Sequence, residues 1–346
     1  MAAQMNMLSN VDLSTANTLR LPCQAERFAA PATLSTLRET LATARRQGWP
    51  VTLLGGGSNV LLPKTLSGLV VCPALNQWWL SQHQGHVLAH VGAGVNWHRL
   101  VMATAARGLW GIENLALIPG SCGAAPVQNI GAYGVELADT LQAVQVMELA
   151  TGRIEWLDAQ QCAFGYRESI FKGALADRVV ITQVVLRLSR TPTPRLGYGD
   201  LAIRLAGSST PTLSPTPLAV AEAVCAIRRE KLPDPHELAN AGSFFKNPLV
   251  PDAQAAQLLQ PYPAMPHFPQ EGGQTKLAAG WLIDQCGLKG MRDGAFGVHQ
   301  QQALVLVHFG GGDRQGLMKT ADYIADQVET RFGVRLEPEP RLINPN

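Results

Sequence analysis

The chain has 346 residues, of which 46% are hydrophobic and 16% are charged, and its formal net charge is +2. This length exceeds what a single hydrophobic core usually spans, so we expect more than one domain. The small net charge argues against a nucleic-acid-binding surface, and no apolar run reaches the roughly 18 residues of a membrane-spanning helix. The start of the chain lacks the basic and apolar regions of a signal peptide, so we expect a cytoplasmic protein.

The cysteines are far apart and form no C-x-x-C pair, which predicts reduced thiols without a disulfide framework or a zinc site. They are Cys23, Cys72, Cys122, Cys162, Cys225 and Cys286. His83, His86 and His90 lie close together in the sequence. On one strand His83 would face away from the other two, so we expect no metal site there. A hairpin is an alternative interpretation of this stretch.

The first part of the chain has the pattern of a small α/β unit. Residues 1–16 are expected to form a loose polar leader. Residues 33–47 are predicted to form a helix whose apolar face carries Leu34, Leu37, Leu41 and Ala44. Strands are predicted at residues 51–54 and 68–72.

Between these two strands lies a glycine-rich segment, Gly55-Gly56-Gly57-Ser58-Asn59, which we call the first glycine loop. Val60 stands where a dinucleotide fingerprint would need glycine, and no Gly-Lys-Ser/Thr follows as in a P-loop. Glycines, a hydroxyl and an amide at a strand end nevertheless suit a pyrophosphate, because the backbone can approach the ligand closely.

The second glycine loop, residues 118–134, follows a predicted strand at 87–91 and a predicted helix at 96–107. Its glycines and alanines can direct several backbone N–H groups at one anion, and its amides both donate and accept. A tightly packed buried turn is the alternative interpretation. Two such loops about 65 residues apart favour one long ligand that is held from two sides.

The remaining elements indicate an antiparallel middle unit and a third unit. A hairpin at 141–149 and 153–157 and a long strand at 179–188 form the middle. Residues 190–217 are rich in Pro, Gly, Ser and Thr, which predicts a long loop and a domain boundary. The third unit is expected to contain helices at 218–229, 280–286 and 314–332, with strands at 303–307 and 334–336.

Eight motifs occur in one order: GGGSNVLLP, ENLALIPG, PVQNIGAYGVEL, FGYRESIFK, KLPDP, NAGSFFKNP, KLAAGWLIDQC and LEPEPR. Together they resemble the UDP-N-acetylenolpyruvoylglucosamine reductase family, from about Asn17 to about Ile343. The resemblance implies a three-domain α+β flavoprotein, with a vanillyl-alcohol-oxidase-like (PCMH-type) pair of FAD-binding domains and a C-terminal α/β substrate domain. The expected divisions are residues 17–82, 83–212 and 213–346, with a tyrosine loop near 190–217 that marks one class of the family.

The implied reaction is the NADPH-dependent reduction of UDP-N-acetylglucosamine enolpyruvate to UDP-N-acetylmuramate through non-covalent FAD, in peptidoglycan synthesis. We therefore expect small-molecule partners only, with no nucleic acid, membrane or metal, and a monomeric protein. Two alternatives remain: another flavin oxidoreductase or oxidase on the same fold, and a non-catalytic nucleotide-binding protein that kept the fold.

The resemblance assigns catalytic roles to Ser243 as proton donor, and to Glu339 and Arg167, which act on the charge that develops in the substrate. From the residues alone, a turn cap is the favoured interpretation of Ser243 and a surface turn that of Glu339, with Glu337 as a rival carboxylate. Two prolines fix the backbone around Glu339. Arg167 is alternatively a structural ion-pair partner, whereas a guanidinium can grip a substrate carboxylate with two bonds.

The binding residues form two expected sets. The cofactor set is Gly55, Gly56, Gly57, Ser58, Asn59, Pro119, Gly120, Ser121, Gly123, Ala124, Gln128, Asn129, Gly131, Ala132, Tyr133 and Gly134. The resemblance assigns the substrate or the nicotinamide cofactor to Tyr166, Tyr198, Lys231, Asn247 and Gln302.

Overall fold

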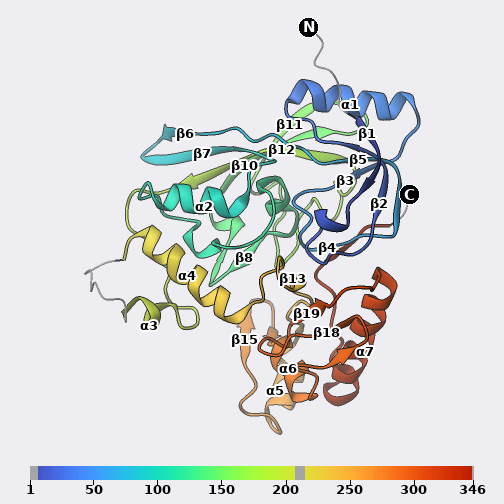
Figure 1. Cartoon of the computed structure of the whole chain (residues 1–346). Helices are drawn as coiled ribbons and strands as arrows, with labels where there is room; N and C mark the ends of the chain where they lie inside the picture. The colour runs from blue at the N-terminus through green and yellow to red at the C-terminus, as the bar shows by residue number, and fades with distance from the viewer. Residues whose placement is uncertain (1–6, 207–214, 345–346) are drawn as a thin grey trace.

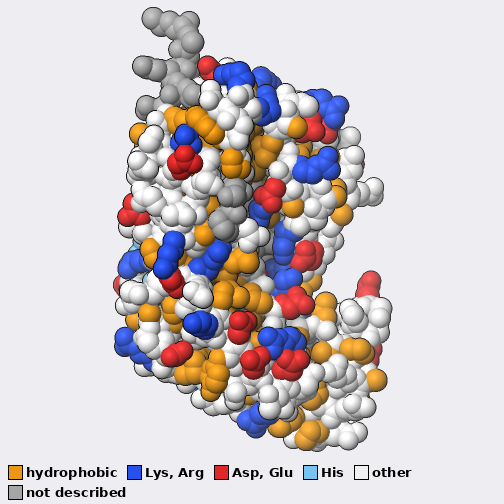
Figure 2. Space-filling view, turned by 90° about the vertical axis from the view of Figure 1, so that its right-hand side faces the viewer, with side chains coloured by type: hydrophobic (Ala, Val, Ile, Leu, Met, Phe, Trp, Pro, Cys, Tyr) orange, Lys and Arg blue, Asp and Glu red, His pale blue; other side chains and the backbone are white. Residues whose placement is uncertain are grey.

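The computed structural model describes residues 7–206 and 215–344. Three groups of elements follow one another along the chain, from blue at the N-terminus to red at the C-terminus (Figure 1). In the face presented in Figure 2, basic and acidic side chains are interspersed, which agrees with the small net charge.

The first group is a four-stranded sheet with the order β1-β2-β5-β3. Its strands are β1 (Met7–Asp12), β2 (Gln24–Ala29), β3 (Val51–Leu53) and β5 (Thr65–Val71), and helix α1 spans Leu34–Arg46. Helix α1 begins with a capping box in which Thr33 and Thr36 satisfy each other's backbone N–H groups. Its buried face packs on β5 and also reaches Met147 and Val180 of the next sheet.

The second group is a five-stranded antiparallel sheet with the order β11-β10-β12-β7-β6. Its strands are β6 (Trp78–His83), β7 (His86–Gly92), β10 (Leu141–Glu148), β11 (Ile154–Asp158) and β12 (Val179–Leu188). Helices α2 (Trp97–Ala105) and α4 (Pro217–Lys231) lie beside this sheet and share one buried hydrophobic cluster with it (Figure 1).

The third group packs against one face of helix α7 (Arg314–Phe332), which ends at Gly333 in the left-handed conformation. One sheet has the order β13-β19-β18-β17, with strands Ala239–Ser243, Val305–His308, Phe296–Val298 and Arg292–Asp293. A second has the order β14-β16-β15, with strands Leu249–Pro251, Gln274–Leu277 and His267–Gln270. Helices α5 (Asp252–Leu259) and α6 (Ala279–Gln285) complete this group.

Short elements connect the groups. Strand β4 (Val60–Leu61) pairs in parallel with β20 (Arg341–Leu342), so the C-terminal segment returns to the first glycine loop. Strands β8 (Gly131–Ala132) and β9 (Val135–Glu136) form a small hairpin in the second glycine loop. The 3-10 helices are η1 (Ser14–Ala16), η2 (Glu113–Leu115), η3 (Cys122–Gln128) and η4 (Leu137–Asp139), and helix α3 spans Leu201–Ala206.

Most predicted elements are confirmed, and four expectations are wrong. Residues 7–12 of the expected leader form strand β1, and residues 1–6 lie outside the described residues. Residues 334–336 do not form a strand, because Val334 and Leu336 are instead buried as side chains against α7. The loop at 190–217 contains helix α3; residues 207–214 of that loop lie outside the described residues. His83 and His86 are cross-strand partners in the β6–β7 hairpin, so the interpretation as one strand is wrong and the hairpin alternative is confirmed.

Helix α4 is the element that bears most on the domain division. The sequence places it at the start of the third unit, but Val220 and Val224 pack into the cluster of the second sheet. We therefore propose that the third unit begins after Lys231 and that the first division lies before Trp78, because strand β6 belongs to the second sheet.

Candidate active site

One long pocket brings both glycine loops together with residues from all three groups of elements. From the first loop it is lined by Gly55, Gly56, Gly57, Ser58 and Asn59, and from the second by Pro119, Ser121, Gly123, Ala124, Gln128 and Gly131. Arg167, Ser243 and Glu339 line the same pocket. The three expected catalytic residues therefore share one cavity with the expected cofactor loops.

The two glycine loops touch each other through their backbones. A Cβ atom on Gly56 would lie only 2.8 Å from Gly120 Cα. Ser58 Oγ donates a hydrogen bond of 3.1 Å to Pro119 O, and the Asn59 amide donates to the side-chain oxygen of Gln128. Asn59 adopts a positive φ of 57°, which an asparagine tolerates better than most residues. Only small residues allow this approach, so the loops form a single binding wall.

The wall also contains a polar atom that is available to hydrogen-bond to a ligand. Asn59 Oδ1 is buried and, among the described residues, has no hydrogen-bond partner. A Cβ atom on Gly55 would lie 3.0 Å from both Ala124 Cβ and Ser121 Oγ, so added bulk would crowd the wall. A free acceptor beside exposed backbone N–H groups suits a ligand with hydroxyls and phosphates, as in a flavin dinucleotide.

Ser243 and Glu339 are brought together by two adjacent backbone segments. Ser243 ends strand β13, beyond a bulge in its pairing with β19. The Glu339 N–H donates to Phe244 O at 2.8 Å, and Phe245 and Pro338 form an antiparallel bridge. Because Pro338 and Pro340 have no N–H, Glu339 supplies the donor that fixes this segment beside Ser243.

Arg167 and Glu339 form the central charge pair of the pocket. Arg167 Nε lies 3.2 Å from Glu339 Oε1, and these side chains are only 18% and 12% exposed. Arg167 Nε makes no aligned hydrogen bond within the described residues, so charge attraction dominates this contact. Nη2 of Arg167 donates to Gly131 O at 3.0 Å, which ties the guanidinium to the second glycine loop. Burial raises the pKa of Glu339, and the Arg167 cation opposes that rise.

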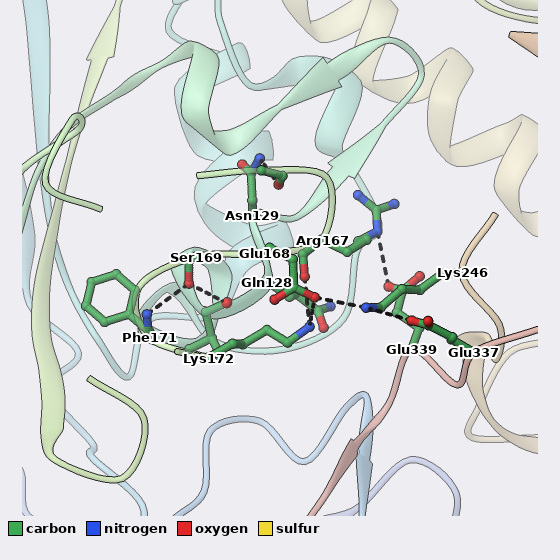
Figure 3. A network of polar contacts seen from close by, with 12 residues as sticks. Gln128, Asn129, Arg167, Glu168, Ser169, Phe171, Lys172, Lys246, Glu337 and Glu339 are labelled. Atoms are coloured by element: carbon green, nitrogen blue, oxygen red, sulfur yellow. Dashed lines mark hydrogen bonds and ion pairs between the residues drawn. The ribbon is translucent and has the colours of Figure 1, made fainter. Parts of the chain in front are cut away.

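Three further charged side chains support this pair (Figure 3). Lys172 and Lys246 both direct their ammonium groups at Glu168 Oε1, each at 2.9 Å. Lys172 also donates to Arg167 O at 2.8 Å. That bond holds Arg167 in a positive φ of 58°, a conformation that arginine rarely adopts. Because Lys246 lies beyond β13 and Glu168 follows Arg167, this network joins the second and third groups of elements.

Comparisons with known proteins identify the family. A sequence profile of the UDP-N-acetylenolpyruvoylglucosamine reductase C-terminal domain matches residues 234–343, and an FAD binding domain profile matches residues 25–158. The chain is 50% identical over 307 residues to a UDP-N-acetylenolpyruvoylglucosamine reductase of Cupriavidus pinatubonensis, covering 89% of this chain and 90% of the relative. It is 47% identical over 337 residues to the enzyme of that name from Chromobacterium violaceum, covering 97% and 98%. The chain belongs to the UDP-N-acetylenolpyruvoylglucosamine reductase family.

A crystal structure of the UDP-N-acetylenolpyruvylglucosamine reductase from Thermus caldophilus has the same fold, with a TM-score of 0.67 and 24% identity. The alignment covers 98% of this chain and 100% of that chain. The expected fold class, an α+β flavoprotein, is confirmed, and so is FAD as the cofactor of this reductase family. The FAD binding profile includes both glycine loops, and the reductase profile includes Ser243 and Glu339.

Five of the expected cofactor residues do not line the pocket: Gly120, Asn129, Ala132, Tyr133 and Gly134. Asn129 is 1% exposed and bonds through its side chain to Glu136, Gly165 and Ala138. Its contacts fix the second glycine loop against the segment that carries Arg167. Gly120 contributes to the binding wall indirectly, because its backbone packs closely against Gly56.

The expected substrate residues also lie outside the pocket lining in this reductase, and four of them form two local groups. Asn247 N donates to the Tyr166 hydroxyl at 3.4 Å, and Asn247 Oδ1 accepts from Ala279 N at the start of α6. Lys231 pairs with Asp200 at 3.0 Å, two residues after Tyr198.

Tyr198 meets the ring of Tyr133 edge-on, with 6.1 Å between ring centroids. The Gln302 side-chain oxygen lies 3.5 Å from Leu304 N.

Sequence reasoning missed two arginines that line the pocket, Arg228 and Arg341. Arg341 ends the LEPEPR motif and pairs with Asp177. Arg228 lies four residues after the buried Val224, which lies four residues after the buried Val220. A cation where this helical spacing predicts an apolar residue was the signal that could have identified Arg228 from the sequence.

Within residues 7–206 and 215–344, no helix is long and apolar enough to cross a membrane. The same residues contain no cluster of His, Cys, Asp or Glu that could hold a metal ion. All six cysteines are free thiols, as expected.

Proposed function

We propose that the protein reduces UDP-N-acetylglucosamine enolpyruvate to UDP-N-acetylmuramate with NADPH and bound FAD, in peptidoglycan precursor synthesis. The observation that carries this proposal is that Ser243, Arg167 and Glu339 line the same pocket as both glycine loops. Membership of the reductase family supports the reaction, since curated relatives of about half-identical sequence bear its name.

The glycine loops are the part of the chain that would hold the cofactor. Bound FAD supplies the two-electron relay between NADPH and the carbon–carbon double bond of the substrate. The backbone N–H groups of Gly55–Ser58 and of Ser121 would bind its phosphates, and Asn59 Oδ1 would accept from one of its hydroxyls.

Arg167 would bind the carboxylate of the enolpyruvyl group. The guanidinium is held from two sides, by Gly131 O and by Glu339, so it is ordered before the substrate arrives. As hydride reaches the terminal carbon, negative charge spreads into this carboxylate. A fixed cation at that place stabilises the charge without reorganisation.

Glu339 would contribute as a hydrogen-bond donor. Its raised pKa favours the protonated acid when the substrate carboxylate joins it at Arg167. A neutral acid can donate to a carboxylate oxygen, whereas an ionised one would repel it. Two carboxyl groups can then share one guanidinium with a proton between them.

Ser243 would donate a proton to the carbon next to the one that receives hydride. Among residues 7–206 and 215–344, no group hydrogen-bonds to the Ser243 hydroxyl, so it can turn toward a ligand in the pocket. The proton leaves as the carbon–hydrogen bond forms, and water returns a proton to the serine oxygen. The balance is one hydride from NADPH and one proton for each substrate molecule.

Further proposals concern the surroundings of the site. We assign the substrate diphosphate to Tyr198 and the neighbouring Lys231, and other contacts with the sugar nucleotide or the nicotinamide cofactor to Tyr166, Asn247 and Gln302. We also propose a cytoplasmic monomer.

An anaerobic two-step experiment tests the function. The purified protein should carry FAD, NADPH should bleach its absorbance near 450 nm (about one equivalent), and the enolpyruvyl substrate should restore the colour. Air in place of substrate should restore it much more slowly. A protein that binds no FAD, or one that oxygen reoxidises faster than the substrate does, contradicts the proposal.

A further inference from the structure

Arg228 is a cation on the buried side of helix α4, four residues beyond Val224, whose side chain is fully buried. Its guanidinium lines the pocket that contains both glycine loops. Burial lowers the pKa of Arg228. Because the ordinary pKa of arginine is above about 12, the side chain remains charged at neutral pH.

The charges that line the pocket do not balance. Its cations are Arg167, Arg228 and Arg341, and its carboxylates are Asp177 and Glu339. Arg167 pairs with Glu339, and Arg341 pairs with Asp177. The side chain of Arg228 has no ion-pair or hydrogen-bond partner among the described residues, and its Nε is buried. A buried charge without a partner is costly, so the site is built for an anion that the chain does not supply.

The position of Arg228 connects it with the catalytic end of the pocket. One helical turn later, Leu232 also lines the pocket, and Pro233 O accepts a hydrogen bond of 3.1 Å from Asn240 Nδ2. That bond holds the end of α4 against strand β13, which ends at Ser243. Arg228 therefore enters from the side of β13, whereas the wall that suits the phosphates is built by the glycine loops.

We propose that Arg228 is the counter-charge for the anion that bound flavin acquires when it is reduced. A flavin gains negative charge at N1 and its neighbouring carbonyl on two-electron reduction, and a cation nearby favours that form. The inference rests on the proposed function, because it assumes FAD in this pocket. Arg228 would then set how readily NADPH reduces the enzyme.

The test compares the bound-flavin midpoint potential in wild type, Arg228→Met and Arg229→Met. Arg229 is the exposed neighbour on the same helix and serves as the matched control. Loss of the buried cation should weaken binding of reduced FAD about 10–100-fold more than binding of oxidised FAD. Because a tenfold change is 29.6 mV for a two-electron couple, the potential of Arg228→Met should fall by about 30–60 mV. Arg229→Met should keep the wild-type potential.

Arg228→Lys and Arg228→Gln provide a second comparison if Arg228→Met does not fold. The lysine variant keeps the charge and should lie above the glutamine variant in potential. Equal potentials in these two, or an unchanged potential in Arg228→Met, overturn the inference. Equal weakening of oxidised and reduced FAD also overturns it, since Arg228 would then bind the cofactor's phosphates. A wild-type protein without FAD contradicts the proposed function instead.

Discussion

The backbone N–H of Glu339 donates a hydrogen bond of 2.8 Å to the carbonyl oxygen of Phe244. This bond joins two segments that are far apart in the sequence, and it places Glu339 in the same pocket as Ser243, the residue before Phe244. Because the bond uses backbone atoms, substitution of either catalytic side chain should leave this placement intact. A change in reaction rate on substitution of Ser243 or Glu339 should therefore report on the chemistry of the side chain rather than on its placement.

Replacement of Ser243 by alanine should separate the two half-reactions. NADPH should still bleach the flavin at a near wild-type rate, because that step needs no proton from Ser243. Reoxidation by the enolpyruvyl substrate should slow by about 10²–10⁴-fold, the usual contribution of general acid catalysis. Ser243→Cys should recover part of the rate, since a thiol can also donate a proton. Stopped-flow absorbance of each half-reaction checks this, and a near wild-type second step in Ser243→Ala would show that the serine is structural.

Glu339→Gln should remove a pH dependence of stability. The pKa of Glu339 is raised by burial, so the stability that this group contributes is complete below about pH 4.5 and declines as the pH rises through its folded value. The glutamine variant cannot ionise, so its unfolding free energy should fall less than that of wild type between about pH 4.5 and 7. Chemical denaturation at both pH values measures this, and Glu337→Gln, at a carboxylate that is 74% exposed, is the control. Parallel pH profiles in wild type and Glu339→Gln would contradict the assignment.

Asp200→Asn should lower the KM for the UDP-sugar substrate. Asp200 pairs with Lys231, which we assign to the substrate diphosphate, so the carboxylate competes with the ligand. Both side chains are more than half exposed, and such pairs contribute at most about 1 kcal/mol, so KM should fall no more than about fivefold. Steady-state kinetics check this, with NADPH reduction of the flavin as the unaffected reference. A raised KM would show that Asp200 itself helps to bind the substrate.

Gly56→Ala should reduce FAD binding. Its Cβ would lie 2.8 Å from Gly120 Cα, so the two glycine loops would have to move apart. Such overpacking typically costs about 1–3 kcal/mol. If the cost falls on the FAD-bound form, the dissociation constant for FAD should rise by roughly 5–150-fold. Fluorescence titration of the apoprotein with FAD measures it. Gly173→Ala is the control, because a Cβ there meets only ordinary contacts at 3.8 Å or more; equal affinity in both variants would contradict the prediction.

Sequence patterns predicted those elements whose signals are local. Helix α1 was predicted from its apolar spacing and α7 from its inner face, and both glycine loops from composition. Strand β1 was missed because half of MLSNVD is polar, without the strict alternation of a strand, and the segment is a strand only through its pairing with β2. The apolar residues Val334 and Leu336 alternate with polar neighbours as in a strand. In the structure, these two side chains are instead buried against α7 without strand pairing. Local patterns carry no information about which distant backbone supplies the partner.

For the candidate site, too, local sequence patterns predict some residues and not others. The motifs carry Ser243, Glu339 and Arg167, but the charge balance that singles out Arg228 depends on which side chains share a cavity. The pairing of Lys231 with Asp200 likewise depends on how helix α3 folds back to α4.

The parallel pairing of β4 with β20 has a consequence for how the protein is made. Arg341 N donates to Asn59 O at 3.0 Å, so the first glycine loop is completed by a segment that the ribosome synthesises long after the loop itself. A nascent chain that already contains both loops still lacks this strand and Glu339. Firm capture of the cofactor must therefore follow translation of the C-terminal segment, and ribosome-stalled chains that end before residue 337 should remain colourless.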